Sequence, residues 1–164
     1  MRKIALVIAV FAMGIGSLAA QKLGHVNAQE IMTLLPERAQ VEADAKAYAQ
    51  TLDSQFQLMG TEYQTKLAEI QQLPPETPEA VRETKITELQ GLEQRINEFQ
   101  VKAQSDMANK EQELLQPLVE KVQNAINKVA ESNNFTYIYD NSVLLYAGGT
   151  DIGPMVKKEL GLAQ

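Results

Sequence analysis

Residues that could carry out chemistry are few and scattered in this sequence. His25 is the only histidine among 164 residues, and the chain contains no cysteine. A metal site needs three or four converging ligands, and a nucleophilic site needs a base within reach of the nucleophile. His25 falls in a predicted strand without clustered carboxylates around it, so we interpret it as a structural residue.

Carboxylate pairs make no better case for catalysis. Glu62 and Glu69 fall on one predicted helix, but no aromatic pocket accompanies them. The sequence also lacks a Gly-rich phosphate loop and the HExxH spacing of a metal site. We therefore predict a protein that is not an enzyme and that uses no cofactor and no metal ion.

Acidic side chains are concentrated in the centre of the chain. Residues 37–111 contain 8 Lys or Arg and 14 Asp or Glu, which accounts for the whole formal net charge of −6. Nucleic acids and anionic membrane surfaces are bound by basic surfaces, so we expect no nucleic-acid partner. We interpret the charge as the solvated face of long helices.

The N-terminus is predicted to be a secretory signal peptide. It has a positively charged start at Arg2-Lys3, an apolar run over residues 4–13, and a small-x-small motif that ends at Ala19. We expect cleavage after Ala19, with Ala20 as the alternative. A retained membrane anchor is the competing interpretation, but the apolar run is shorter than the roughly twenty residues that a span needs.

Two long helical runs dominate the rest of the chain. Their apolar residues recur at gaps of three or four, which places them on one helical face. In the first run these positions are Val41, Ala45, Tyr48, Leu52, Phe56, Met59, Tyr63, Leu67 and Ile70; in the second they are Ile96, Phe99, Ala103, Met107, Lys110, Leu114 and Leu118, with Lys110 as the polar exception. The spacing is nearer an 11-residue than a 7-residue repeat, so we expect two nearly straight helices whose apolar faces meet.

The segment Pro74-Pro75-Glu76-Thr77-Pro78 separates the two runs. Its prolines remove backbone donors and fix φ, so the chain must turn here and form a helical hairpin. About forty helical residues give an arm of roughly 60 Å. Such an arm is too thin to enclose a core of its own.

Both ends of the chain are predicted to form a small β-containing head. Residues 22–26 are a strand candidate, and Asn27 with Glu30 has the spacing that opens a helix. Two aromatic and β-branched runs, residues 135–139 and 143–147, flank Asp140-Asn141-Ser142 and predict a β-hairpin. A terminal helix over residues 152–160, capped by Thr150 or Asp151, would stop at Gly161.

The predicted fold class is α+β, a long α-helical hairpin on a small β-strand head. We place the signal peptide at residues 1–19, the head at 20–35 and 115–164, and the arm at 36–114 with its turn at 74–78. A head with only a few strands forms a poor independent core. We therefore expect self-association to complete the head.

Three positions could make the arms flexible. Gly60 and Gly91 interrupt the two runs. Each glycine lowers helix stability by up to about 1 kcal/mol relative to Ala, although both could also be tolerated surface glycines. Pro117 stands inside an otherwise helical pattern, where a kink is expected. We therefore predict Gly60, Gly91 and Pro117 as hinge candidates.

Together these features resemble the Skp/OmpH family of periplasmic chaperones. The likeness covers essentially the whole chain after the signal peptide. In order, it consists of the strand running into Val26-Asn27, the long arms, Leu114-Leu115-Gln116-Pro117 with Lys121-Val122-Gln123 after it, Phe135-Thr136-Tyr137-Ile138-Tyr139-Asp140, Leu144-Leu145-Tyr146, and Asp151-Ile152 followed by Val156-Lys157-Lys158.

The resemblance implies a homotrimer whose strands form a central β-barrel body, with three helical hairpins projecting as tentacles around a cavity. It implies an ATP-independent periplasmic holdase for unfolded outer-membrane β-barrel proteins, working between the inner membrane and the outer-membrane assembly machinery. The best-known members have basic arms, whereas these arms are acidic and rather short. A lipopolysaccharide site is therefore not carried over.

Candidate contact residues follow from this interpretation. Client contacts are expected from apolar arm residues off the hairpin seam or near its tip, namely Leu58, Leu73, Val81, Ile86 and Leu92. Trimer contacts are expected from the head residues Val26, Val122, Ile126, Tyr137, Tyr139, Leu145 and Tyr146. The alternative function is an exported coiled-coil spacer or docking adaptor of an envelope complex, which would bind one folded partner.

Overall fold

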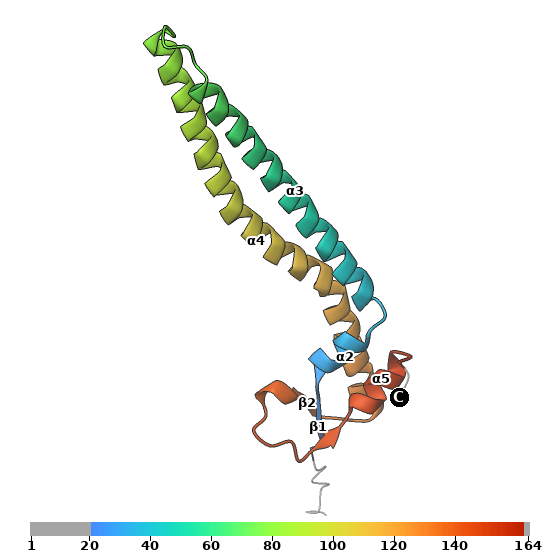
Figure 1. The fold of residues 1–164 in the computed structure, drawn as a ribbon. Coiled ribbons are helices and arrows are strands. Elements are labelled where there is room, and N and C mark those ends of the chain that lie inside the picture. Colours follow the sequence, from blue (N-terminus) through green and yellow to red (C-terminus); the bar gives the residue numbers. More distant parts are fainter. Residues whose placement is uncertain (1–20, 163–164) are drawn as a thin grey trace, which may run out of the picture. The chain divides into compact units, whose positions relative to one another are not determined.

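The computed structural model describes residues 21–162, so the predicted signal peptide and its cleavage site lie outside the described residues. The elements in chain order are β1 (Leu23–Val26), α2 (Ala28–Leu34), α3 (Arg38–Gln71), α4 (Glu79–Ser132), β2 (Tyr137–Asp140), a 3₁₀ helix (Asn141–Val143), β3 (Thr150–Asp151) and α5 (Gly153–Glu159) (Figure 1).

These elements form two compact units. The hairpin unit contains residues 32–121, and the head unit contains the described residues up to Ile31 and from Val122 onward. The structure thus groups residues 32–35 and 115–121 with the hairpin, whereas the predicted boundaries place them in the head.

In the hairpin unit, α3 and α4 run side by side (Figure 1). All nine apolar positions predicted for the first run are half-buried. In the second run, Leu118 is buried and the other six positions are half-buried. The predicted seam is therefore confirmed. No residue of α3 is fully buried, because a single neighbouring helix covers only one side of it.

The turn between the helices forms where the prolines predict it. The chain leaves α3 after Gln71 and enters α4 at Glu79, directly after Pro78. The Thr77 N–H donates to the Pro74 carbonyl at 3.0 Å, and the Arg82 guanidinium donates to the same carbonyl at 3.4 Å.

The helices continue through all three hinge candidates. A Cβ added at Gly60 or Gly91 would meet no atom within 4 Å, so packing does not require glycine at either position. Pro117 lies inside α4, which stays helical on both sides of it. A hinge role for these three residues remains a prediction.

The head unit contains a three-stranded sheet in the order β2-β1-β3. β1 lies in the centre and pairs parallel with both neighbours, with Leu23 opposite Tyr137 and His25 opposite Asp151. The predicted β-hairpin of residues 135–139 and 143–147 is therefore wrong. Only its first run forms a strand, and that strand pairs with the N-terminal segment.

Local hydrogen bonds explain this difference. The Asp140 carboxylate accepts from the Ser142 N–H at 2.8 Å, which bends the chain into the 3₁₀ helix instead of reversing it. The same side chain accepts from the Ala28 N–H at 3.3 Å at the start of α2. Thr150 and Asp151, predicted as a helix cap, form β3 beside β1, and the Asp151 carboxylate also accepts from the Gly153 N–H at 2.8 Å at the start of α5.

The core of the head packs α4 and α5 with β1 and the start of α2. Its buried apolar residues are Val26, Ile31, Val122, Ala125, Ile126, Val129, Ile152 and Val156. The C-terminal ends of α4 and α5 close near Asn134 and Gly161, which adopt positive φ values of 56° and 70°, and the stop at Gly161 was predicted. At each, the following N–H reaches back to the helix, Phe135 to Ala130 at 3.0 Å and Leu162 to Lys157 at 2.9 Å.

None of the described helices is both long enough and apolar enough to cross a membrane.

We predict that Gly24→Val destabilises the head. A Cβ at Gly24 would lie 3.0 Å from Phe135, 3.1 Å from Ile138 and 3.1 Å from Ile152, so a branched side chain overpacks the core by about 1–3 kcal/mol. Chemical unfolding followed by circular dichroism measures this. Gly60→Ala is the control and should raise helix stability by up to about 1 kcal/mol. An unchanged unfolding midpoint for Gly24→Val would contradict the packing described here.

Candidate functional site

His25 has a structural role in the head. Its side chain is 9% exposed, and its Nδ1 lies 2.9 Å from the Oδ1 of Asn141. This hydrogen bond ties the 3₁₀ helix to the central strand. Within residues 21–162, no group of three or more His, Cys, Asp or Glu side chains is placed to hold a metal ion. The candidate site is therefore sought on the apolar surfaces.

The client-binding candidates differ in exposure. Leu58 is 65% exposed, Val81 45% and Ile86 41%, whereas Leu73 is half-buried beside the turn. The prediction of Leu92 as a client contact on the surface is wrong, because its side chain is 0% exposed. It belongs to the packed seam of α4, and we remove it from the set of surface candidates.

Val101 is an exposed apolar residue that the sequence analysis missed. It lies on α4 and is 72% exposed, more than any of the five predicted client contacts. Its position two residues from both Phe99 and Ala103 turns it away from the seam, since residues two apart on a helix do not share a face. Reading the opposite face of the second run would have found it.

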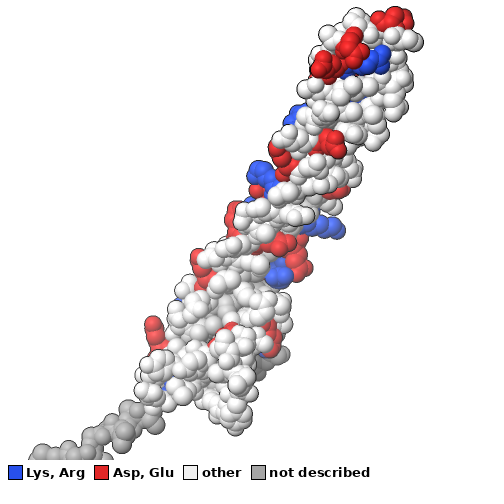
Figure 2. Space-filling model, turned by 90° about the vertical axis from the view of Figure 1, so that its left-hand side faces the viewer, with Lys and Arg blue, Asp and Glu red and all other residues white. Residues whose placement is uncertain are grey.

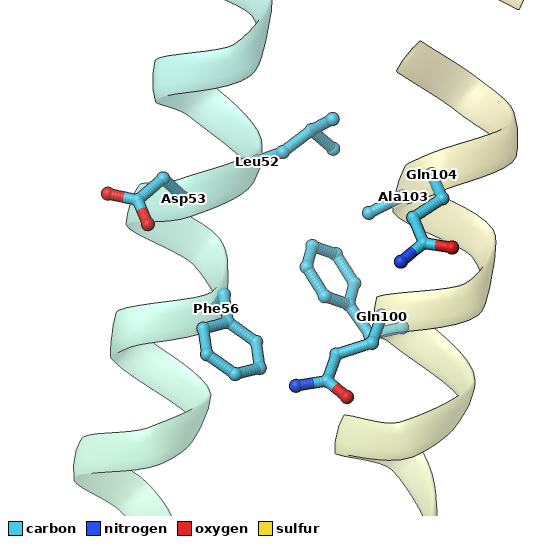
Figure 3. A pocket seen from close by; sticks show the side chains of 7 residues that line it. Leu52, Asp53, Phe56, Gln100, Ala103 and Gln104 are labelled. Atoms are coloured by element: carbon cyan, nitrogen blue, oxygen red, sulfur yellow. The ribbon is translucent and has the colours of Figure 1, made fainter. Parts of the chain in front are cut away.

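A groove opens between the two helices of the hairpin unit (Figure 3). Its volume is about 390 Å³, and it is lined by Leu52, Asp53, Phe56, Phe99, Gln100, Ala103 and Gln104. Leu52 and Ala103 point into the space between the helices, and the amides of Gln100 and Gln104 lie at its rim (Figure 3). The groove was not predicted from the sequence.

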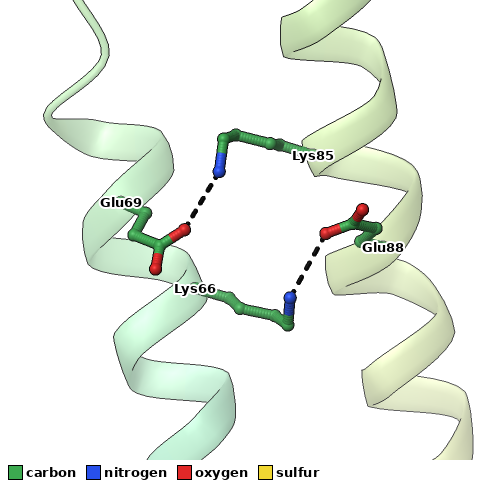
Figure 4. A network of polar contacts seen from close by, with 4 residues as sticks. All are labelled: Lys66, Glu69, Lys85 and Glu88. Atoms are coloured by element: carbon green, nitrogen blue, oxygen red, sulfur yellow. Dashed lines mark hydrogen bonds and ion pairs between the residues drawn. The ribbon is translucent and has the colours of Figure 1, made fainter.

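Ion pairs join the helices near the turn (Figure 4). Lys66 of α3 contacts Glu88 of α4 at 3.2 Å, and Lys85 of α4 contacts Glu69 of α3 at 3.0 Å. The hydrogen bond from Lys85, aided by its charge, holds the pKa of Glu69 below its usual range. We call these four residues the tip clamp.

At the other end of the hairpin unit, Lys121 of α4 pairs with Glu37, the residue before α3. This hydrogen bond lowers the pKa of Glu37. Elsewhere on the hairpin, ion pairs such as Lys102 with Asp106 at 2.8 Å stay within one helix. Acidic and basic side chains are interspersed along the face shown in Figure 2.

The predicted trimer contacts fall into three groups. Val26, Val122 and Ile126 are buried in the core of the head. Tyr137 and Tyr139 are 52% and 43% exposed on β2, an edge strand of the described sheet. Leu145 and Tyr146 are almost fully exposed in the segment between the 3₁₀ helix and β3.

Known proteins similar to this chain were found in three comparisons. The model of a family described as outer membrane protein (OmpH-like) matches residues 22–160. The Chaperone protein Skp of Vibrio cholerae serotype O1 is 28% identical over 142 residues, which cover 78% of this chain and 76% of that protein. The Chaperone protein Skp of Photorhabdus laumondii is 28% identical over 157 residues, 91% of each chain.

Among solved structures, an OmpH-like outer membrane chaperone from Caulobacter crescentus CB15 has the same fold. The two structures match with a TM-score of 0.66 at 17% sequence identity, and the match covers 90% of this chain and 88% of that chain. The long helical hairpin with a small three-stranded sheet is thus shared with that protein.

We predict that the tip clamp opens at acidic pH. Because pairing lowers the pKa of Glu69 in the folded state, its stabilising effect is present above the unfolded pKa and is lost as pH falls through the folded pKa. Hydrogen exchange of the amides flanking residues 74–78, corrected for intrinsic rates, should show this loss of protection. At neutral pH, the double variant Glu69→Gln with Glu88→Gln should reproduce it.

Glu62→Gln is the matched control, since Glu62 lies on the same helix and makes no ion pair among the described residues. High salt should weaken the wild-type clamp in the same direction, because exposed pairs are screened. Equal exchange in the double variant and in Glu62→Gln would show that the pairs do not hold the tip.

Proposed function

The chain belongs to the OmpH-like outer membrane protein family, and from this membership we propose that it is an ATP-independent holdase chaperone. Its relatives carry the name of a chaperone, and the family is non-enzymatic. The proposed clients are unfolded outer-membrane β-barrel proteins, which the protein shields until they fold.

The observation that carries this proposal is the exposure of α3. This helix has 34 residues and no fully buried side chain, although an apolar stripe runs along its whole length. A helix that packed into an ordinary core would bury such a stripe. Here the stripe stays half-accessible, which suits a surface that contacts other chains.

Many weak contacts explain how such a surface holds clients without a fixed sequence. An unfolded membrane strand exposes alternate apolar residues, and Leu58, Leu73, Val81 and Ile86 offer apolar surface along the hairpin and near its tip. Full burial of one such side chain contributes about 1.5–3 kcal/mol, and partial burial contributes less. Release then needs no ATP, because folding into a bilayer can outcompete the set.

Assembly into a homotrimer is part of the proposal. The head of one chain leaves Tyr137, Tyr139, Leu145 and Tyr146 exposed. Within the described residues, β2 pairs with β1 on one side and with no strand on the other. Edge strands and exposed aromatic residues favour association with another chain. Three such heads would form the β-barrel body, with the hairpins around a client cavity.

The proposed location is the periplasm, after cleavage of the signal peptide following about Ala19. This location fits the relatives' role as outer-membrane chaperones, and it places the outer-membrane assembly machinery among the proposed partners. Flexing at Gly60, Gly91 or Pro117 would let the cavity adjust to clients of different size.

The first prediction concerns mass and client uptake. Light scattering of the exported chain should give the mass of three chains, and addition of a urea-unfolded outer-membrane β-barrel protein should add the mass of one soluble client. Several unrelated clients of this class should behave alike. A monomer, or a trimer that leaves the client to aggregate, would contradict the holdase and favour the spacer or adaptor.

The second prediction concerns the exposed apolar residues. The triple variant Leu58→Ser, Val81→Ser and Ile86→Ser should weaken client binding about tenfold or more, because each substitution removes about 0.5–1 kcal/mol of apolar contact. Titration of a labelled unfolded client measures the dissociation constant. Val119→Ser removes an apolar residue of similar exposure, 43%, near the base of the hairpin and should change binding little.

A further inference from the structure

The hairpin unit is fastened at its two ends and open in its middle. The tip clamp joins α3 to α4 near the turn, and Lys121 with Glu37 joins them at the base. Leu92 and Leu118 are the buried side chains of α4 in this unit, one toward each end. Between these ends, no hydrogen bond or ion pair within the described chain links the two helices.

The groove between the helices lies in this open middle. Leu52, Phe56, Phe99 and Ala103 give it an apolar floor. Cavities of about 150 Å³ already hold benzene, so a groove of about 390 Å³ has room for one aromatic side chain and its flanking backbone. Edge-to-face contact with Phe56 and Phe99 favours an aromatic occupant over an aliphatic one.

The length of the groove excludes larger occupants. Its lining spans Leu52–Phe56 on α3 and Phe99–Gln104 on α4, which is about 6–8 Å along a helix. An extended acyl chain needs about 15 Å, half the thickness of a bilayer core. One side chain matches the observed length.

The polar side chains that line the groove are the Asp53 carboxylate and the amides of Gln100 and Gln104, and the amides match a peptide backbone. The Gln100 and Gln104 amides make no hydrogen bond among residues 21–162, whereas Gln57 and Gln94 donate to Asp53 and Glu98 on their own helices. A free amide both donates and accepts, as a peptide group does. No Lys or Arg of the described chain lines the groove, so an anionic ligand would find no cation there.

We propose that this groove binds a single aromatic side chain of an unfolded polypeptide, with Gln100 and Gln104 hydrogen-bonded to the backbone beside it. The proposal rests on the proposed holdase function and adds one defined contact point to each arm. The rest of the client would still be held by scattered weak contacts.

Photo-crosslinking tests the groove. A urea-unfolded outer-membrane β-barrel protein carries benzoyl-phenylalanine at one aromatic position, and mass spectrometry locates its crosslinks on the full exported protein. Crosslinks should concentrate on Leu52, Phe56 and Phe99 rather than on the outward-facing Val101 and Ala108. Ala103→Phe fills the groove and should lower this yield about fivefold, the effect of losing one buried apolar contact.

Ala108→Phe is the matched control, since it adds the same side chain at an exposed position of the same helix. The double variant Gln100→Ala with Gln104→Ala keeps the apolar floor and should lower the yield about threefold, as expected for lost hydrogen bonds. Circular dichroism checks that each variant is helical. If Ala103→Phe does not fold, the crosslink map and the glutamine variant decide the question.

The possible failures are distinguishable. If the wild type keeps the client soluble but crosslinks spread evenly along the arms, or if Ala103→Phe and Ala108→Phe behave alike, the groove proposal is overturned and the holdase stands. An unchanged yield in the glutamine variant overturns the backbone contacts. If the client aggregates with the wild type as it does alone, the holdase function fails, and the groove proposal fails with it.

Discussion

Two helices packed side by side cannot surround a side chain, and this constraint governs the hairpin. Every apolar position in the stripe of α3 remains half-buried, although the stripe continues over the whole helix. Half-burial contributes only part of the about 1.5–3 kcal/mol that a fully buried side chain provides. The seam therefore gains little per residue, so its stability is the sum of many half-buried contacts, and the exposed ion pairs at its two ends add a modest amount.

The features that the sequence predicted well are those set by local chemistry. The apolar stripes, the proline turn, the Asn27 cap and the stop at Gly161 depend on residues a few positions apart. The strand pairing failed because β2 pairs with β1, over 100 residues away in the chain. Aromatic runs beside a turn sequence indicate strands, but the Asp140 hydrogen bonds decide that the chain does not reverse there.

In the candidate site too, features set by local sequence were predictable and features set by distant contacts were not. Leu58, Val81 and Ile86 could be recognised as exposed, because helical periodicity places them off the main stripe. Leu92 was misassigned because the predicted stripe of the second run began at Ile96, so its continuation one turn earlier was overlooked. The groove could not be predicted, since it depends on the small Ala103 of one helix facing Leu52 of the other, and register across a hairpin is not a local property.

The weak packing of this seam suits the proposed function. Segments with few buried apolar contacts open at low free energy, so the middle of the hairpin can adjust its spacing without unfolding the fastened ends. A tighter seam would bury the stripe of α3 and remove the surface that an unfolded chain could contact. The stability absent from the seam is found instead in the head, where Val26, Val122, Ile152 and Val156 are buried to 2% exposure or less. A firmly packed head and a half-open hairpin would keep the proposed self-assembly apart from the proposed client contact.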